Sequence, residues 1–252
     1  MEELVEPKPI NTKIIKLWSD EYNDAENDVR IPLIYEEMKN HPVLVIGLNP
    51  AYNPLGVWST LRAAGKKITY DEVVRRFQWR NFDEDLSVSW SKLEHKTSKY
   101  CKPNYFHPIM EYCKRIGFKP DAFNVVDLYF YRSTILGDLE NVVGRVAGRT
   151  CFGKEQIRLS WELINKFTPS IVLINGVRTL EHLLHDNDGL DVNDININPP
   201  RPRRGEYFSN GCITLNDKKI VCQCCSMMGV GAPFPTEARI RMAEEAARRI
   251  NR

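Results

Sequence analysis

The sequence predicts an α/β fold, namely a three-layer α/β/α sandwich around a central, mainly parallel sheet of four strands. Four short, continuous apolar runs rich in β-branched residues are each bounded by turn residues, which is typical of strands buried on both faces. The segments between these runs carry apolar residues at helical spacing. A chain of 252 residues with 42% hydrophobic residues is long enough for one domain of this kind.

The predicted elements alternate along the chain. The strands are expected at 43–48, 122–128, 170–175 and 219–225. The helices are expected at 105–116, 154–167, 177–184 and 236–250, and the last of these closes the sheet.

Two further segments have a predicted conformation. The stretch 11–40 is expected to be mostly helical with an interruption at Ile31-Pro32, so that residues 1–40 form a helical extension of a single domain spanning 1–252. A hairpin is expected over 211–222, because Asn216-Asp217 is a turn pair between two apolar runs. The longest irregular regions, 51–104 and 186–208, are expected to be loops near a binding site.

Charge and cysteine usage narrow the setting in which the protein works. The net charge of +2 neither requires nor excludes a polyanionic partner. The odd number of cysteines, seven, in a chain without a signal-like start favours reduced thiols. No stretch approaches the roughly 18 apolar residues of a membrane span. We therefore expect a cytoplasmic monomer that does not associate with membranes.

The most informative motif follows the first predicted strand and reads Gly47-Leu48-Asn49-Pro50-Ala51-Tyr52-Asn53-Pro54. In open parallel sheets ligands bind beyond the carboxyl ends of the strands, where a glycine permits a close backbone approach. Asn-Pro is also ordinary turn chemistry. On position alone, the motif is equally compatible with a binding site and with a simple turn.

The stretch VLVIGLNPAYNP resembles the first motif of the uracil-DNA glycosylase superfamily, closest to its mismatch-specific and single-strand-selective branches. Residues 123–128 (FNVVDL) resemble the second strand with its base-reading Asn, and residues 169–180 resemble the third strand, glycine and helix. Residues 221–237 take the place of the last strand and the minor-groove loop. The resemblance, which spans about residues 41–250, implies a protein that binds a flipped-out nucleobase in DNA and hydrolyses its N-glycosidic bond without cofactor or metal.

The resemblance also implies roles for individual residues. Asn49 matches the residue that orients the attacking water, and Gly47, Leu48 and Pro50 belong to the substrate pocket. Asn124 matches the residue whose carboxamide reads the pyrimidine edge, since an amide offers both a donor and an acceptor. Because an amide is not a strong base, catalysis would depend on water positioning and on stabilisation of the departing base.

A ring that stacks on the base is expected from Tyr52, Tyr105 or Phe106. Tyr52 and Phe106 are favoured, and ordinary core packing is the alternative for both. Contacts to DNA phosphates and unstacked bases are expected from Arg201, Arg203 and Arg204, which lie in the Pro-stiffened segment PPRPRRGEYF. A solvated loop is the alternative interpretation of this arginine run.

The last motif departs from the family pattern. The family supplies a His or Asn followed by Pro-Ser or a similar pair, whereas this chain reads Cys224-Cys225-Ser226-Met227-Met228-Gly229-Val230-Gly231. Ser226 donates one hydrogen bond, and His107 or a main-chain amide is expected to replace the missing group if the chain is active. Met227 and Met228 are expected either to fill the gap left by a flipped base or to form an ordinary loop. The alternative function is a weakened or inactive member that binds nucleic acid or a nucleotide.

Two other chemistries are suggested by parts of the sequence. Cys222, Cys224 and Cys225 suggest a metal site, but on a strand Cys225 faces away from the other two, and metal sites typically use Cys-x-x-Cys on turns. We therefore expect buried free thiols and no metal or cluster. A nucleotide hydrolase on a doubly wound fold would need carboxylates at strand ends, for which Asp127 is the only good candidate.

Overall fold

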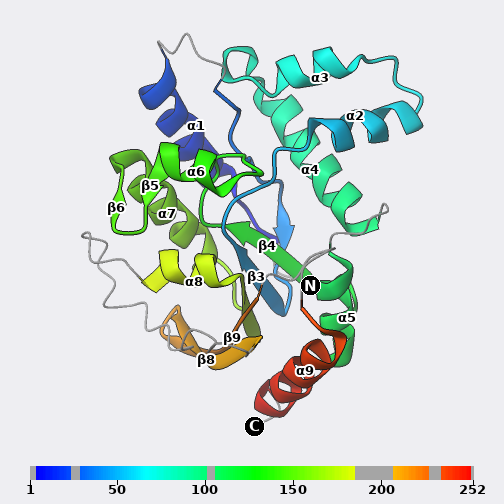
Figure 1. Ribbon diagram of the computed structural model, residues 1–252, viewed down its shortest axis with the longest axis vertical. Coiled ribbons are helices and arrows are strands. Elements are labelled where there is room, and N and C mark those ends of the chain that lie inside the picture. The colour runs from blue at the N-terminus through cyan, green and yellow to red at the C-terminus, as the bar shows by residue number, and fades with distance from the viewer. Residues whose placement is uncertain (1–3, 24–28, 101–105, 185–206, 227–233, 251–252) are drawn as a thin grey trace.

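The computed structural model of the chain describes residues 4–23, 29–100, 106–184, 207–226 and 234–250 (Figure 1). Its centre is a five-stranded sheet in the order β4-β3-β7-β9-β8. The four neighbours β4, β3, β7 and β9 are parallel, and β8 is antiparallel to β9 at one edge. The bounds are β3 (Val43–Gly47), β4 (Phe123–Asp127), β7 (Ile171–Asn175), β8 (Phe208–Leu215) and β9 (Lys218–Cys225).

These strands confirm the predicted α/β class and the four parallel strands. The fifth strand comes from the predicted hairpin, which is confirmed but is longer than expected. Its turn residues, Asn216 and Asp217, have φ of 48° and 58°, the left-handed pair of a type I′ turn. The Asn216 side chain donates to the carbonyl of Asn165 at 2.7 Å, which ties the turn to the helix that precedes β7.

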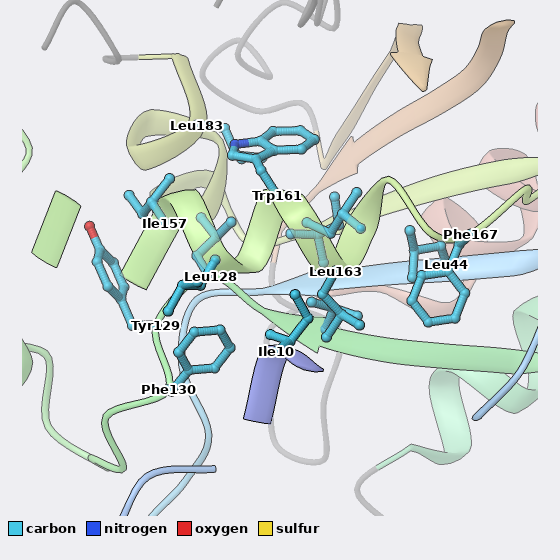
Figure 2. Packing of buried hydrophobic residues seen from close by; sticks show 14 of the residues in the cluster. Ile10, Leu44, Leu128, Tyr129, Phe130, Ile157, Trp161, Leu163, Phe167 and Leu183 are labelled. Atoms are coloured by element: carbon cyan, nitrogen blue, oxygen red, sulfur yellow. The ribbon is translucent and has the colours of Figure 1, made fainter. Parts of the chain in front are cut away.

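One face of the sheet is covered by α1 (Lys8–Tyr22), α6 (Leu136–Val143), α7 (Cys151–Ile164) and α8 (Val177–Leu184). Figure 2 shows side chains of this cluster, which come from α7 (Ile157, Trp161 and Leu163), from β3 (Leu44) and from α1 (Ile10). Between α6 and α7, β5 (Gly144–Arg145) and β6 (Gly148–Arg149) form a small antiparallel pair.

The opposite face is covered by α5 (His107–Arg115) and α9 (Thr236–Ile250), which pack against the alternate side chains of the same strands. Cys222 and Cys224 belong to the α7 face, and Cys225 belongs to the α5 face, as the predicted alternation requires. Helices therefore flank the sheet on both sides, which is consistent with an α/β/α sandwich.

The N-terminal segment differs from its prediction. Among its described residues α1 is the only helix, and residues 31–37 are neither helix nor strand before β2 (Met38–Lys39), which pairs with β1 (Leu4–Val5). Backbone amides of this part donate to other segments, as when the amide of Ile31 donates to the carbonyl of Phe77 at 2.8 Å. Because Ile10, Ile14 and Trp18 are fully buried, α1 is part of a sandwich layer and not an appended extension.

The described part of the region 51–104, residues 51–100, is largely helical, which contradicts the expected long loop. It contains α2 (Pro54–Ala63), α3 (Tyr70–Arg76), the 3-10 helix η1 (Trp79–Asn81) and α4 (Glu84–Tyr100), which together we name the helical lobe. Figure 1 shows the lobe as a separate group of helices beside the sheet. Its own apolar core consists of Ile31, Val57, Val73, Phe77 and Trp90.

Two helices of the lobe begin at side chains that cap them. The Asn53 side chain accepts from the amide of Gly56, with Pro54 in the first turn of α2. The Thr69 side chain accepts from the amide of Glu72 at the start of α3, which is half of a capping box.

None of the helices among the described residues has both the length and the apolar character needed to cross a bilayer. The cysteines of these residues are free, and no group of three or more His, Cys, Asp or Glu side chains among them is arranged to hold a metal ion. Burial raises the pKa of the thiols of Cys222 and Cys225 well above the usual range.

Two helical glycines provide a matched test of the packing between α6 and α7. A Cβ on Gly153 would lie 2.2 Å from the carbonyl oxygen of Val143, whereas a Cβ on Gly137 would have nothing within 4 Å. Gly153→Ala is therefore expected to destabilise the fold by about 1–3 kcal/mol, because the main chain of α6 must move. Gly137→Ala is expected to be neutral or to stabilise by up to about 1 kcal/mol. Urea unfolding of both variants checks this, and equal effects would contradict it.

Candidate functional site

The carboxyl ends of the four parallel strands meet at one edge of the sheet. Gly47 at the end of β3 pairs with Asp127 at the end of β4, and Asn175 of β7 pairs with Cys225 of β9. The helix before β4, α5, and the helix before β7, α7, lie on opposite faces. The direction of winding therefore reverses beside β3, and ligands of doubly wound sheets bind at the carboxyl end of such a switch point. This edge is the candidate site.

The loop that follows β3 is held against the loop that follows β4 by several hydrogen bonds. The Asn49 side-chain nitrogen donates to the carbonyls of Ser133 at 2.7 Å and Pro50 at 3.1 Å. The backbone amides of Tyr129 and Ser133 donate to the carbonyls of Leu48 and Pro50. Both side-chain bonds of Asn49 use its nitrogen, so the amide oxygen of this half-buried residue is the atom that can accept from a ligand or water.

Asp127 lies directly beside the backbone of Gly47. A Cβ at position 47 would be 2.1 Å from Asp127 Oδ1, so the glycine is required by the carboxyl group of the neighbouring strand. The amide of Asp127 donates to the hydroxyl of Tyr35 at 3.0 Å. Burial of the carboxyl group raises the pKa of Asp127 to about 7, although Arg132 acts to lower it. Carboxyl groups with raised pKa are frequent in functional sites, and the sequence had indicated Asp127 only as the strand-end carboxylate of a nucleotide hydrolase.

Asn124 does not lie at this edge. It is the second residue of β4 and pairs with Leu44, near the amino end of the sheet. Its side-chain nitrogen donates to the carbonyl of Lys39 at 2.6 Å. Gly47, which ends β3, is three positions beyond Leu44, about 10 Å along the strand at ~3.3 Å per residue, and Asn49 follows in the loop. The structure therefore does not bring the two amides to one pocket, and the geometry gives no support to Asn124 as the base-reading residue.

The two favoured aromatic side chains lie apart. The ring of Tyr52 has the Arg30 guanidinium 4.2 Å from its centroid and the ring of Phe77 at 5.5 Å, so it is engaged with the helical lobe. Phe106 packs edge-on against Phe123, the first residue of β4, with 5.6 Å between centroids. Phe106 therefore has the core-packing role that was its alternative.

The remaining predicted residues are distributed as follows. Pro50 is buried, and Leu48 is half-buried against the core of the α7 face. Ser226 directly follows β9 at the candidate edge, and its amide donates to the carbonyl of Tyr207 at 2.8 Å. His107 is exposed at the start of α5. Tyr105, Arg201, Arg203, Arg204, Met227 and Met228 lie outside the described residues.

Two arginines that sequence reasoning missed connect the lobe to the candidate edge. Arg132 is 1% exposed, donates to the hydroxyl of Ser91 at 3.3 Å and lies 5.4 Å from the centroid of Phe77. Arg30, whose guanidinium lies over Tyr52, donates to the carbonyl of Arg132 at 2.7 Å. The sequence did contain a signal for Arg132, because it directly follows the apolar run LYFY. An arginine at such a position is expected to be buried close to the end of a strand, which is uncommon for a charged residue.

A scan of the chain against models of known protein families gives no match, and a search of curated proteins gives none either.

Proposed function

We propose that the chain is a DNA glycosylase-like protein that binds a flipped-out nucleobase at the carboxyl edge of its sheet and hydrolyses the N-glycosidic bond. The observation that supports this best is the fixed position of Asn49, braced by Ser133 and Pro50 at the switch point of a parallel sheet. The proposed fold is that of the uracil-DNA glycosylase superfamily. The proposed partner is single- or double-stranded DNA, and the free cysteines favour a cytoplasmic setting.

In the proposed reaction, water attacks the sugar carbon that carries the base. The Asn49 oxygen accepts a hydrogen bond from this water and fixes its direction. The water oxygen forms a bond to C1′ while the bond from C1′ to the base nitrogen breaks, and the base leaves with that electron pair. The water proton passes to the base or to solvent. Ser226 follows β9 at the same edge and is the proposed donor to the departing base.

The test is a panel of oligonucleotides that contain uracil, hypoxanthine or a mismatch, each as a single strand and as a duplex. The expected result is an abasic site, detected as strand cleavage after alkali, for at least one base. Intact DNA across the whole panel would exclude glycosylase activity on these bases.

A second candidate function is binding without turnover. It is favoured by the end of β9, where Cys225-Ser226 takes the place of the His or Asn expected from the resemblance. Fluorescence anisotropy with the same panel separates the two functions. Binding of a base-containing oligonucleotide with no abasic product would favour the binding module.

A further inference from the structure

We propose that Asp127 reads the edge of the bound base, and that it does so as a neutral carboxylic acid. The inference rests on the proposed function, because it takes the ligand at the carboxyl edge to be a nucleobase. A neutral carboxyl group donates one hydrogen bond through its O–H and accepts one through its carbonyl oxygen. It therefore matches a base edge that presents a ring N–H next to a carbonyl, as uracil and hypoxanthine do.

The position of Asp127 supports this role. Among the residues that end the described parallel strands, Asp127 is the only carboxylic acid, and it pairs with Gly47, two residues before Asn49. Since position 47 has no side chain, the carboxyl group lies over the backbone that leads into the Asn49 loop. Asn124, which the resemblance suggested for base reading, is three residues earlier on β4 and binds Lys39 instead.

The surroundings of the carboxyl group favour its neutral form. Burial is the larger influence on its pKa, which is raised to about 7, and the charge of Arg132 opposes it. Arg132 is the described titratable group whose charge acts on Asp127, and Asp127 in turn acts on the neighbouring Tyr35. Burial and the nearby Asp127 both raise the pKa of Tyr35 well above its usual range, so this hydroxyl stays neutral. A bound base would exclude water and favour the neutral acid further.

The protonation state of Asp127 also determines which base edge its carboxyl group can pair with. An ionised carboxylate has only acceptors, so it would prefer an edge with two adjacent N–H donors, as in guanine. The neutral acid presents one donor and one acceptor, which match the ring N–H and the adjacent carbonyl that uracil and hypoxanthine present. Uracil and hypoxanthine are therefore the expected substrates, and their recognition should weaken as Asp127 ionises.

The decisive comparison is excision by the wild-type chain and by Asp127→Asn between pH 6 and pH 8, with uracil and hypoxanthine oligonucleotides. Wild-type kcat/KM is expected to fall about 10-fold over this interval, because the acid ionises near pH 7. The variant is expected to remain active with a flat profile, because an amide offers a donor and an acceptor at every pH. Asp121→Asn, an exposed acid in the loop before β4, is the matched control and should retain the wild-type slope.

The effect of Asp127→Asn on the stability of the fold distinguishes a role of this residue in base recognition from a role in folding. The folded pKa of Asp127 is above the ordinary value of about 4, so this group favours folding at low pH, and that contribution is lost as pH rises from about 4 to 7. Asparagine does not ionise, so Asp127→Asn avoids the stability that the wild type loses as pH rises. The variant should therefore be no less stable than the wild type at pH 8, as measured by thermal unfolding.

Three results would overturn the inference. These are a flat wild-type profile, a wild-type slope retained in Asp127→Asn, and a folded Asp127→Asn variant that no longer excises either base. In each case excision by the wild-type chain leaves the proposed function standing. A wild-type chain that neither excises nor binds any base at either pH would reject the proposed function itself.

Discussion

Replacing Asn49 with alanine is expected to reduce kcat for base excision by about 100-fold or more. The variant loses the oxygen that orients water, together with the two hydrogen bonds that hold the loop against Ser133 and Pro50. Even a displacement of about 1 Å in a positioning group lowers rates by a factor of this size. Single-turnover excision assays with saturating protein measure the effect on the chemical step directly.

Asn53→Ala is the matched control for this prediction. Asn53 lies in the same loop and is exposed, and its side chain caps α2 instead of bracing the carboxyl edge. Its replacement is expected to cost about 1 kcal/mol of stability and to leave the excision rate near the wild-type value. If the two variants lost activity equally, Asn49 would have no special role in positioning water.

Replacing Gln223 with leucine is expected to lower the free energy of unfolding by about 2–5 kcal/mol. Gln223 is fully buried, and its side chain accepts from the Tyr112 hydroxyl at 2.6 Å. Its nitrogen donates to Asn210 Oδ1 at 2.7 Å and to the carbonyl of Met242 at 2.9 Å. Leucine has nearly the same volume but leaves the buried hydroxyl and carbonyl without these partners. Urea unfolding monitored by circular dichroism measures the change.

The control for Gln223 is Tyr112→Phe, which removes one of the three bonds and keeps the ring. It is expected to cost about 1–2 kcal/mol, clearly less than the loss of the amide. A leucine variant as stable as the wild type would show that the network connecting β9 with α5 and α9 contributes nothing to stability.

The sheet was predictable because its signal is local. Each parallel strand is a continuous apolar run, and the alternation along 222–225 correctly assigned Cys222 and Cys224 to one face and Cys225 to the other. The helical lobe was not predictable in the same way. Its apolar core is small and includes Ile31, which lies far away in the sequence, so no single segment contains a strong pattern.

The candidate site was predictable only in part. The motif at Gly47 indicated the correct end of β3, since a glycine followed by Asn-Pro is informative about position. Asn124 was chosen by residue type, although its place as the second residue of β4 puts it at the opposite end of the sheet. Asp127 ends that strand, and the close approach of its carboxyl group to Gly47 depends on the register between two strands about 80 residues apart, which one sequence does not reveal.

The separate core of the helical lobe has a consequence for how this protein could change its substrate. The lobe is inserted between β3 and α5, and within the described residues it is connected to the candidate edge through Arg30 and Arg132. Substitutions on its outer surface leave the side chains of the sheet untouched, so they cost the central core nothing. We expect that a new preference for strand length or sequence context can arise in this insert while the carboxyl edge of the sheet keeps its shape.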